Sequence, residues 1–229
     1  MGSNFIKYFK LSSGMSDFGR KKFDWPPQAA TVEIVQEYWK WLCNLPKASN
    51  PAIDNDGDRD TEANKLNPKG KEYVFLSFAL DGGKNRICTI PEGKKVLIPS
   101  LSCIASTPDV ENPELNDEQL RRLANTDQEN IEYRRIEIDG KPLVGDLEKD
   151  YRVKAPRNGV FVVNYAERAV FNAPKGPSRA VADGVYLVWK PSKGDHIVHF
   201  EGKIDVPEEE DSLEFRDYIE DVTYTLKVR

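Results

Sequence analysis

The sequence predicts a mainly β protein: an antiparallel β-sandwich of the jelly-roll type with one N-terminal amphipathic helix and a short second helix. Three observations lead to this class. Short apolar or alternating segments recur along the chain, clusters of turn residues separate them, and the pattern shows no regular intervening helices. We expect a single β-sandwich domain over residues 31–229, in keeping with a length of 229 residues, after an N-terminal arm over residues 1–30.

The helices are predicted from periodicity and from capping residues. The arm mixes Gly, Ser, Lys and two prolines without a sustained period, so we expect no fold of its own there. In the next segment, "TVEIVQEYWKWLCNLP", apolar residues recur three and four apart, Thr31 is suited to cap the N-terminus, and Pro46 stops the helix. The second helix is expected in "NDEQLRRLANT", where Asn116 and Gln119 stand in the register of a capping box.

Most other segments have the patterns of strands. "EYVFLSFAL" (72–80) is apolar on both faces, which is typical of a central strand, and "KKVLIPSL" (94–101) follows after a turn. The dipeptide Asp139-Gly140 between two alternating segments predicts a β-hairpin. The terminal "DVTYTLKV" alternates as a half-buried antiparallel strand does. Three further strands are expected at 159–165, 184–190 and 196–202.

Charge and hydropathy exclude several classes of protein. The net charge is −5 and the basic residues are scattered, so the chain has no cationic stripe for a nucleic acid. No stretch approaches the roughly 18 to 20 apolar residues of a membrane span. The N-terminus lacks the apolar core of a signal peptide, which predicts a cytoplasmic protein; the alternative is an exported protein whose leader has been removed.

The three cysteines do not form a recognisable site. Cys43, Cys88 and Cys103 have no CxxC spacing and are odd in number, which favours free, partly buried thiols over a zinc site or a disulfide framework.

The segment "IDNDGDRD" (53–60) is the candidate metal site. Calcium binds six to eight oxygens, and Asp54, Asp56 and Asp58 at alternate positions could provide three of them. The EF-hand pattern is incomplete, because its sixth and twelfth positions lack the required Gly and Glu. The alternative is an ordinary hydrophilic turn rich in Asp and Gly.

Catalytic residues cannot be assigned from this sequence. His196 and His199 lie three apart in a predicted strand, so their side chains point to opposite faces and cannot bind one metal together. The motifs of serine hydrolases, zinc proteases and nucleotide-binding proteins are absent. Two carboxylates suited to glycoside chemistry would leave no local signature. We therefore lean against an enzyme.

Tryptophans are the candidates for ligand contacts. Trp39, Trp41 and Trp189 could form a platform on which sugar rings stack. The alternative is that they are core residues, because Trp39 belongs to the apolar stripe of the first helix and Trp189 to a predicted strand. Trp25, in the "FDWPP" segment of the arm, is the better candidate for an exposed anchor to another chain.

Several motifs together resemble a widespread family of uncharacterised bacterial and archaeal proteins that are often exported. They are the Trp-x-Trp helix, Asn-Pro-x-x-Asp-x-x-Gly, Arg-x-Cys-x-Ile-Pro-x-Gly-Lys, "IDGKPL", "GDHIVHFEG" and the terminal "DVTYTLKV", which span residues 32–228. The resemblance implies a secreted all-β domain and no particular substrate. It also implies a cysteine at the position of Asp60, as the partner of Cys88. In this chain Asp60 replaces that cysteine. Two explanations of the replacement stay open: a reducing compartment, in which the disulfide would not form, or a metal ion that holds the acidic loop.

We expect a non-catalytic binding or interaction module of unknown ligand. The alternatives are a carbohydrate-active enzyme, either a hydrolase or a lyase, and a structural protein that self-assembles into a homo-oligomer through its arm. The expected partner is a carbohydrate or a protein, with no nucleic acid and no membrane span, and calcium is the one candidate cofactor. The candidate ligand-binding residues are Trp25, Trp41, Arg86 and His196.

Overall fold

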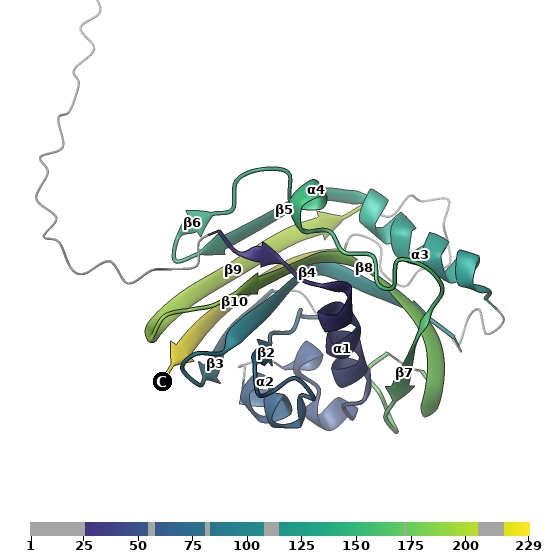
Figure 1. Cartoon of the computed structure of the whole chain (residues 1–229), viewed down its shortest axis with the longest axis horizontal. Helices are drawn as coiled ribbons and strands as arrows, with labels where there is room; N and C mark the ends of the chain where they lie inside the picture. The colour runs from purple at the N-terminus through teal and green to yellow at the C-terminus, as the bar shows by residue number, and fades with distance from the viewer. Residues whose placement is uncertain (1–25, 55–57, 81–82, 108–114, 172, 206–217) are drawn as a thin grey trace, which may run out of the picture.

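The computed structural model describes residues 26–54, 58–80, 83–107, 115–171, 173–205 and 218–229, and over these residues the protein is mainly β (Figure 1). The first sheet contains β1 (Gln28–Ala29), β8 (Gly176–Trp189), β4 (Lys95–Ser106) and β2 (Tyr73–Phe75) in that order, with β7 (Phe161–Tyr165) also paired to β8. The second sheet has the order β3 (Gly83–Ile90), β10 (Tyr218–Val228), β9 (Gly194–Ile204), β5 (Ile131–Ile138) and β6 (Lys141–Pro142).

The helices lie outside these two sheets. Those of the described ranges are α1 (Val32–Cys43), α2 (Asp58–Ala63), α3 (Asp117–Glu129) and α4 (Leu147–Tyr151), with 3-10 turns at Lys47–Ser49, Pro51–Ile53 and Asn64–Leu66. The two predicted caps are confirmed. The Thr31 side chain accepts a hydrogen bond from the Ile34 amide, and Asn116 and Gln119 form a reciprocal capping box at the start of α3. Sequence reasoning missed the short helices α2 and α4.

The mainly β class is confirmed, but both sheets are mixed and not antiparallel throughout, as the prediction of an antiparallel sandwich implied. Strand β10 pairs with β9 in the antiparallel sense and with β3 in the parallel sense, and β2 is parallel to β4. The β2 and β4 strands are joined through β3, which lies in the other sheet, and the chain therefore returns to the first sheet in its original direction. No alternation in a single strand carries that information, because the pairing depends on the path of the whole chain.

The segment predicted as a central strand over 72–80 forms only the short edge strand β2 and then leaves the sheet. Residues 76–79 stay buried. Their backbone groups bond to side chains instead: the Tyr224 hydroxyl accepts from the Ser77 amide, and the Tyr218 hydroxyl donates to the Ala79 carbonyl at 2.6 Å. The segment is apolar on both faces because it is enclosed, not because it is central.

The core has two layers. One cluster lies between the sheets, where Val96, Ile98 and Leu187 of the first sheet meet Phe200 and Leu226 of the second. The second cluster covers the other face of the first sheet, on which α1 packs with a stripe of buried residues: Val35, Tyr38, Trp39, Leu42 and Cys43. The order of layers is therefore second sheet, first sheet, helix α1 (Figure 1).

A bulge in β4 joins the two sheets at one end. The pairing of β4 with β8 shifts between Ser100 and Cys103, and Leu101 adopts a left-handed φ of 40°. The Leu101 side chain packs against Gly202 of β9, where a Cβ atom would lie 2.5 Å from Leu101 Cδ1. The bulge turns the Leu101 amide and carbonyl toward side chains of the second sheet and of α3.

The predicted hairpin and the end of the predicted arm are also seen. Asp139 and Gly140 connect β5 to β6 with φ values of 52° and 68°, the left-handed pair that a tight two-residue turn requires. Residues 28 and 29, assigned to the arm from the sequence, pair with β8 as β1, and Ala30 is buried. The described chain therefore pairs with the first sheet at residues 28 and 29, before α1 begins at Val32.

Candidate functional site

A groove of about 480 Å³ lies between the end of α3, the start of β5 and the start of α4. Its walls come from consecutive elements of the chain, because all lining residues fall between positions 128 and 148, from the end of α3 through β5 and β6 to the start of α4. The lining residues are Gln128, Glu129, Ile131, Tyr133, Arg134, Leu143, Gly145, Asp146, Leu147 and Glu148.

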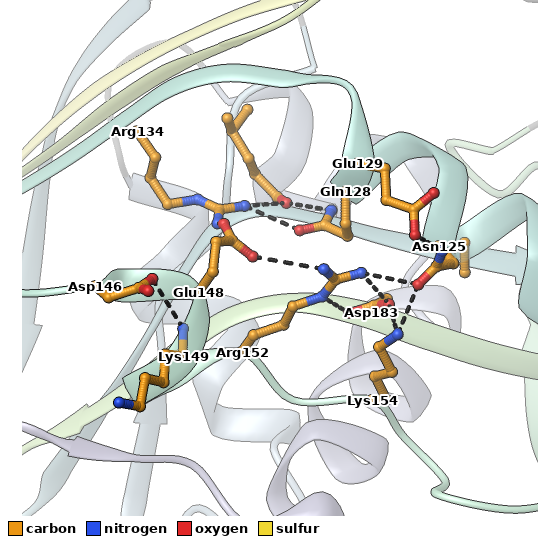
Figure 2. Close-up of polar contacts among 12 residues, drawn as sticks. Asn125, Gln128, Glu129, Arg134, Asp146, Glu148, Lys149, Arg152, Lys154 and Asp183 are labelled. Atoms are coloured by element: carbon orange, nitrogen blue, oxygen red, sulfur yellow. Dashed lines mark hydrogen bonds and ion pairs between the residues drawn. The ribbon is translucent and has the colours of Figure 1, made fainter.

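Arg134 holds the three walls of this groove together (Figure 2). Its side chain is only 3% exposed. One guanidinium nitrogen pairs with the Glu148 carboxylate of α4, and the other donates to Gln128 Oε1 at 2.9 Å and to the Leu101 carbonyl at 3.1 Å. Burial lowers the pKa of Arg134 to about 10, which still leaves the group charged at neutral pH. The groove is therefore formed before any ligand arrives.

A second arginine, Arg152, contacts Glu148 and links α4 to α3 and β8 (Figure 2). Arg152 binds the Asp183 carboxylate through two nitrogens, at 2.8 and 2.9 Å, and donates to Asn125 Oδ1 at 3.1 Å. It also lies 3.8 Å from the second oxygen of Glu148. Such paired, planar contacts restrict the side chains strongly. As a result α4, α3 and β8 are fixed relative to one another under the groove.

The lining of the groove includes three carboxylates and one tyrosine. Glu129 and Asp146 are exposed, Glu148 is half-buried, and Tyr133 is 43% exposed. Glu129 lies in the last turn of α3, where exposed carbonyls make a negative charge unfavourable, and this turn has no basic residue. Leu143 and Leu147 supply an apolar floor. These groups suit a ligand with a cationic or hydrogen-bond-donating head and an apolar stem.

Arg86, a predicted ligand-binding residue, is buried in a separate polar cluster. Its guanidinium donates to the Tyr224 hydroxyl at 2.9 Å and to the backbone carbonyl of Asp54 at 3.0 Å, and it lies 3.7 Å from the Asp60 carboxylate. It also donates to the carbonyls of residues 77 and 78. The side chain is enclosed on all sides, so in this structure Arg86 connects α2, the chain after β2, and β10 rather than facing a ligand.

Asp60 has the most perturbed environment of this cluster. It is fully buried, accepts from the Tyr224 hydroxyl at 3.0 Å, and burial raises its pKa to about 7 against the opposing effect of Arg86. Burial raises the pKa of the Cys88 thiol, and the nearby Asp60 carboxylate raises it further. The position at which the family resemblance implies a cysteine therefore lies beside Cys88, and a buried ion pair occupies it here.

The acidic loop is described only in part. The Asp54 carboxylate accepts from the Arg59 amide at 2.8 Å and lies 3.8 Å from Arg59 Nε, so it binds the N-terminus of α2. Asp56 and the side chain of Asp58 lie outside the described residues. Among the side chains that are described, no group of three His, Cys, Asp or Glu could hold a metal ion. Calcium binding stays a hypothesis.

The described cysteines carry free thiols: Cys43 and Cys88 are buried and Cys103 is partly buried.

Glu220 is a second buried carboxylate and was not predicted. It lies in β10 between the sheets and is fully buried. One oxygen accepts from the Leu101 amide at 2.8 Å, whereas the other has no hydrogen-bond partner among the described residues. Burial raises the pKa of Glu220 to about 7, although the Leu101 amide, Arg134 and Arg86 lower it. Glu220 stands in alternating register with Val222 and Tyr224, so the period of the strand places it on the buried face although its type is typical of the surface.

His196 is also buried and bonded at both ring nitrogens. Nδ1 lies 2.8 Å from Asp139 Oδ2 and Nε2 lies 2.9 Å from the Ser192 carbonyl, with Ser192 Oγ further away at 3.4 Å. The ring packs edge-on against Trp189. Because Nε2 faces a carbonyl oxygen, it must donate and cannot act as the base of an activated serine. His199 points to the other face of the sheet, as expected, and pairs with Asp221.

The three tryptophans of the predicted platform are core residues, so the surface platform is wrong. Trp39, Trp41 and Trp189 are each at most 3% exposed. Trp39 donates to the Tyr186 hydroxyl at 2.7 Å, and Trp41 donates to the Ala63 carbonyl at 2.9 Å. The indoles of Trp39 and Trp41 fill the space between α1 and the first sheet, whereas that of Trp189 lies in the cluster between the two sheets. Trp25 lies outside the described residues.

The groove residues were missed for a physical reason. Arg134 and Glu148 are ordinary charged residues in their own segments, and only the chain path places them together. The helix predicted over "NDEQLRRLANT" ends at residue 126, so it did not include Glu129, which the structure places in the last turn of α3.

Comparisons with known proteins add no assignment. A scan against models of protein families finds no match, and searches of curated proteins and of solved structures find none. In the described part of the chain, no helix has the length and apolar character needed to cross a bilayer.

Proposed function

We propose that the protein is a non-catalytic binding module that holds a cationic segment of a polypeptide in the groove between α3, β5 and α4. The observation that carries this proposal is the preformed groove itself: three carboxylates and a half-exposed tyrosine line it, and the buried Arg134 network fixes its walls. A site held by such a network binds without first ordering its own side chains.

The chemistry of the groove matches a Lys or Arg side chain. Glu129 and Asp146 can accept hydrogen bonds from an ammonium or guanidinium group, and the face of Tyr133 attracts the same cation. Leu143 and Leu147 can contact the aliphatic stem. The Glu148 charge is balanced by Arg134 and Arg152, so Glu129 and Asp146 supply the net attraction.

The enzyme alternative has weaker support. Asp60 and Glu220 have raised pKa values, as acid–base catalysts often do, but both are enclosed in the interior. A carbohydrate ligand is the second candidate, because sugar rings also stack on an exposed tyrosine and bond to carboxylates. The self-assembly alternative, the jelly-roll connectivity of the sandwich and membership of the exported family all stay predictions.

The test is a selection of randomised peptides displayed on phage against the full-length protein. We expect the selected peptides to be rich in Lys and Arg, to bind with micromolar to millimolar Kd, and to lose at least about tenfold in affinity for Glu129→Gln/Tyr133→Ala. The matched control is Glu118→Gln, which removes a carboxylate from the far end of the same helix. Selected peptides without basic residues, or equal binding to both variants, would refute the proposal. Binding confined to a glycan array would favour the carbohydrate alternative instead.

A further inference from the structure

We propose that the N-terminal segment of this chain, residues 1–25, is the groove's own ligand and occupies it in cis. This inference rests on the proposed function, since it names the polypeptide that the groove holds when no other partner is present. It follows from two properties of the molecule: the distribution of charge along the sequence and the place where the described chain begins.

The segment and the rest of the chain have opposite charges. Residues 1–25 contain five Lys and Arg against two Asp, whereas the remaining residues contain 28 Lys and Arg against 36 Asp and Glu. Three of the five cations, Arg20, Lys21 and Lys22, are consecutive, and aromatic residues flank them at positions 18, 23 and 25. A cationic and aromatic segment is the ligand that the carboxylates and Tyr133 of the groove are suited to bind.

The start of the described chain lies next to the groove. Strand β1 pairs with β8 at Leu187 and Val188, Pro27 is buried, and α4, which begins with the groove residues Leu147 and Glu148, lies against β1. Arg20, Lys21 and Lys22 precede Pro26 by four to six residues. An extended chain covers about 3.3 Å per residue, so these cations reach roughly 13 to 20 Å from Pro26.

Attachment to the same chain compensates for weak contacts. A tethered segment acts at an effective concentration of about 1 mM. If a free peptide of this kind binds with a Kd of about 0.1 mM, the tethered segment fills the groove in roughly nine of ten molecules, and an external peptide binds about tenfold more weakly than it would to an empty groove.

The experiment is zero-length cross-linking of the full-length protein with a carbodiimide. The reagent activates a carboxylate as an O-acylisourea, a lysine amine attacks the carbonyl carbon, and an amide forms while the urea leaves. We expect cross-links from Lys21 or Lys22 to Glu129 or Asp146, within one molecule when isotopically heavy and light protein are mixed. The pair Lys69 and Glu33, 2.7 Å apart, is the internal positive control. In Glu129→Gln/Asp146→Asn the cross-links from the segment should vanish while the control cross-link persists.

A second measurement separates this inference from the proposed function. The variant Arg20→Gln/Lys21→Gln/Lys22→Gln should bind a selected basic peptide about tenfold more tightly than wild type, and 0.5 M NaCl should reduce that difference. Unchanged affinity, cross-links to the acidic run at 207–211, or cross-links that join heavy to light molecules would each overturn binding in cis and leave the groove as a site for other polypeptides. Failure to select any basic peptide on this triple variant, together with no cross-link from the segment to the groove, would instead refute the proposed function.

Discussion

Replacing the buried carboxylate of Glu220 by an amide should make the protein less sensitive to pH. In Glu220→Gln the side chain keeps a carbonyl oxygen that can accept the hydrogen bond from the Leu101 amide, but it can no longer ionise between the sheets. The residue is fully buried, and its second oxygen has no hydrogen-bond partner in the described part of the chain, so the charged form is poorly compensated in the folded state.

The size of the effect follows from the two pKa values. An unfolded glutamate loses its proton near the ordinary value of 4.5, whereas burial raises the pKa of Glu220 in the folded state to about 7. Between these values the unfolded chain binds fewer protons than the folded one, so the free energy of unfolding falls as pH rises. One pKa unit corresponds to about 1.4 kcal/mol, which predicts a loss of about 3 kcal/mol from this residue between pH 4.5 and pH 7.

The assay is urea denaturation of wild type and variant from pH 4.5 to pH 8. The free energy of unfolding of Glu220→Gln minus that of wild type should become more positive by about 3 kcal/mol over this range, whatever its value at pH 4.5. The control is Glu118→Gln, which removes a carboxylate whose side chain is 86% exposed and which should follow the wild-type profile. A difference that stays flat or decreases with pH would refute the reasoning.

Three further predictions concern the core and the acidic loop. Gly202→Ala should lower the free energy of unfolding by about 1 to 3 kcal/mol, because the new Cβ would lie 2.7 Å from a backbone carbonyl oxygen that cannot move aside. Urea denaturation measures this change, and a loss below about 0.5 kcal/mol would contradict the prediction. Arg86→Met should lower the free energy of unfolding by about 3 to 5 kcal/mol at pH 8, because it leaves the Asp60 carboxylate buried without its cation. The double variant Arg86→Met/Asp60→Asn should regain part of this loss. A double variant as unstable as Arg86→Met would argue against the ion pair. Calcium and EDTA should leave Tm unchanged, because the Asp54 carboxylate is already bound to the start of α2, and a rise in Tm with calcium would restore the metal site.

Local features of the fold could be predicted with some precision. Thr31, Asn116 and Gln119 cap their helices, and Asp139-Gly140 forms the hairpin turn, because each of these structures depends on contacts between residues only a few positions apart. The mainly β class followed in the same way from alternation within single segments. The short helices α2 and α4 were missed because neither has enough turns to show a period.

The candidate site depended on the tertiary structure almost entirely. Arg86 and His196 were predicted to bind a ligand, but both are buried and bonded to other residues of the protein, and only the fold shows this. Arg134 was not singled out, although it holds the groove together through α3, α4 and the β4 bulge.

The sequence alone determined the secondary-structure class, the caps, the hairpin turn and the charge difference between the N-terminal segment and the rest of the chain. Each of these rests on neighbouring residues or on composition. Only the tertiary structure decided the parallel pairing of β3 with β10, the burial of Asp60 and Glu220, and the groove. The physical reason is that the strand pairing and the buried carboxylates join residues far apart in sequence, such as Glu220 and Leu101, whose contact and pKa depend on what encloses them. The groove residues lie within positions 128–148, but their arrangement depends on how α3, β5 and α4 turn against one another and on the Leu101 carbonyl that Arg134 binds.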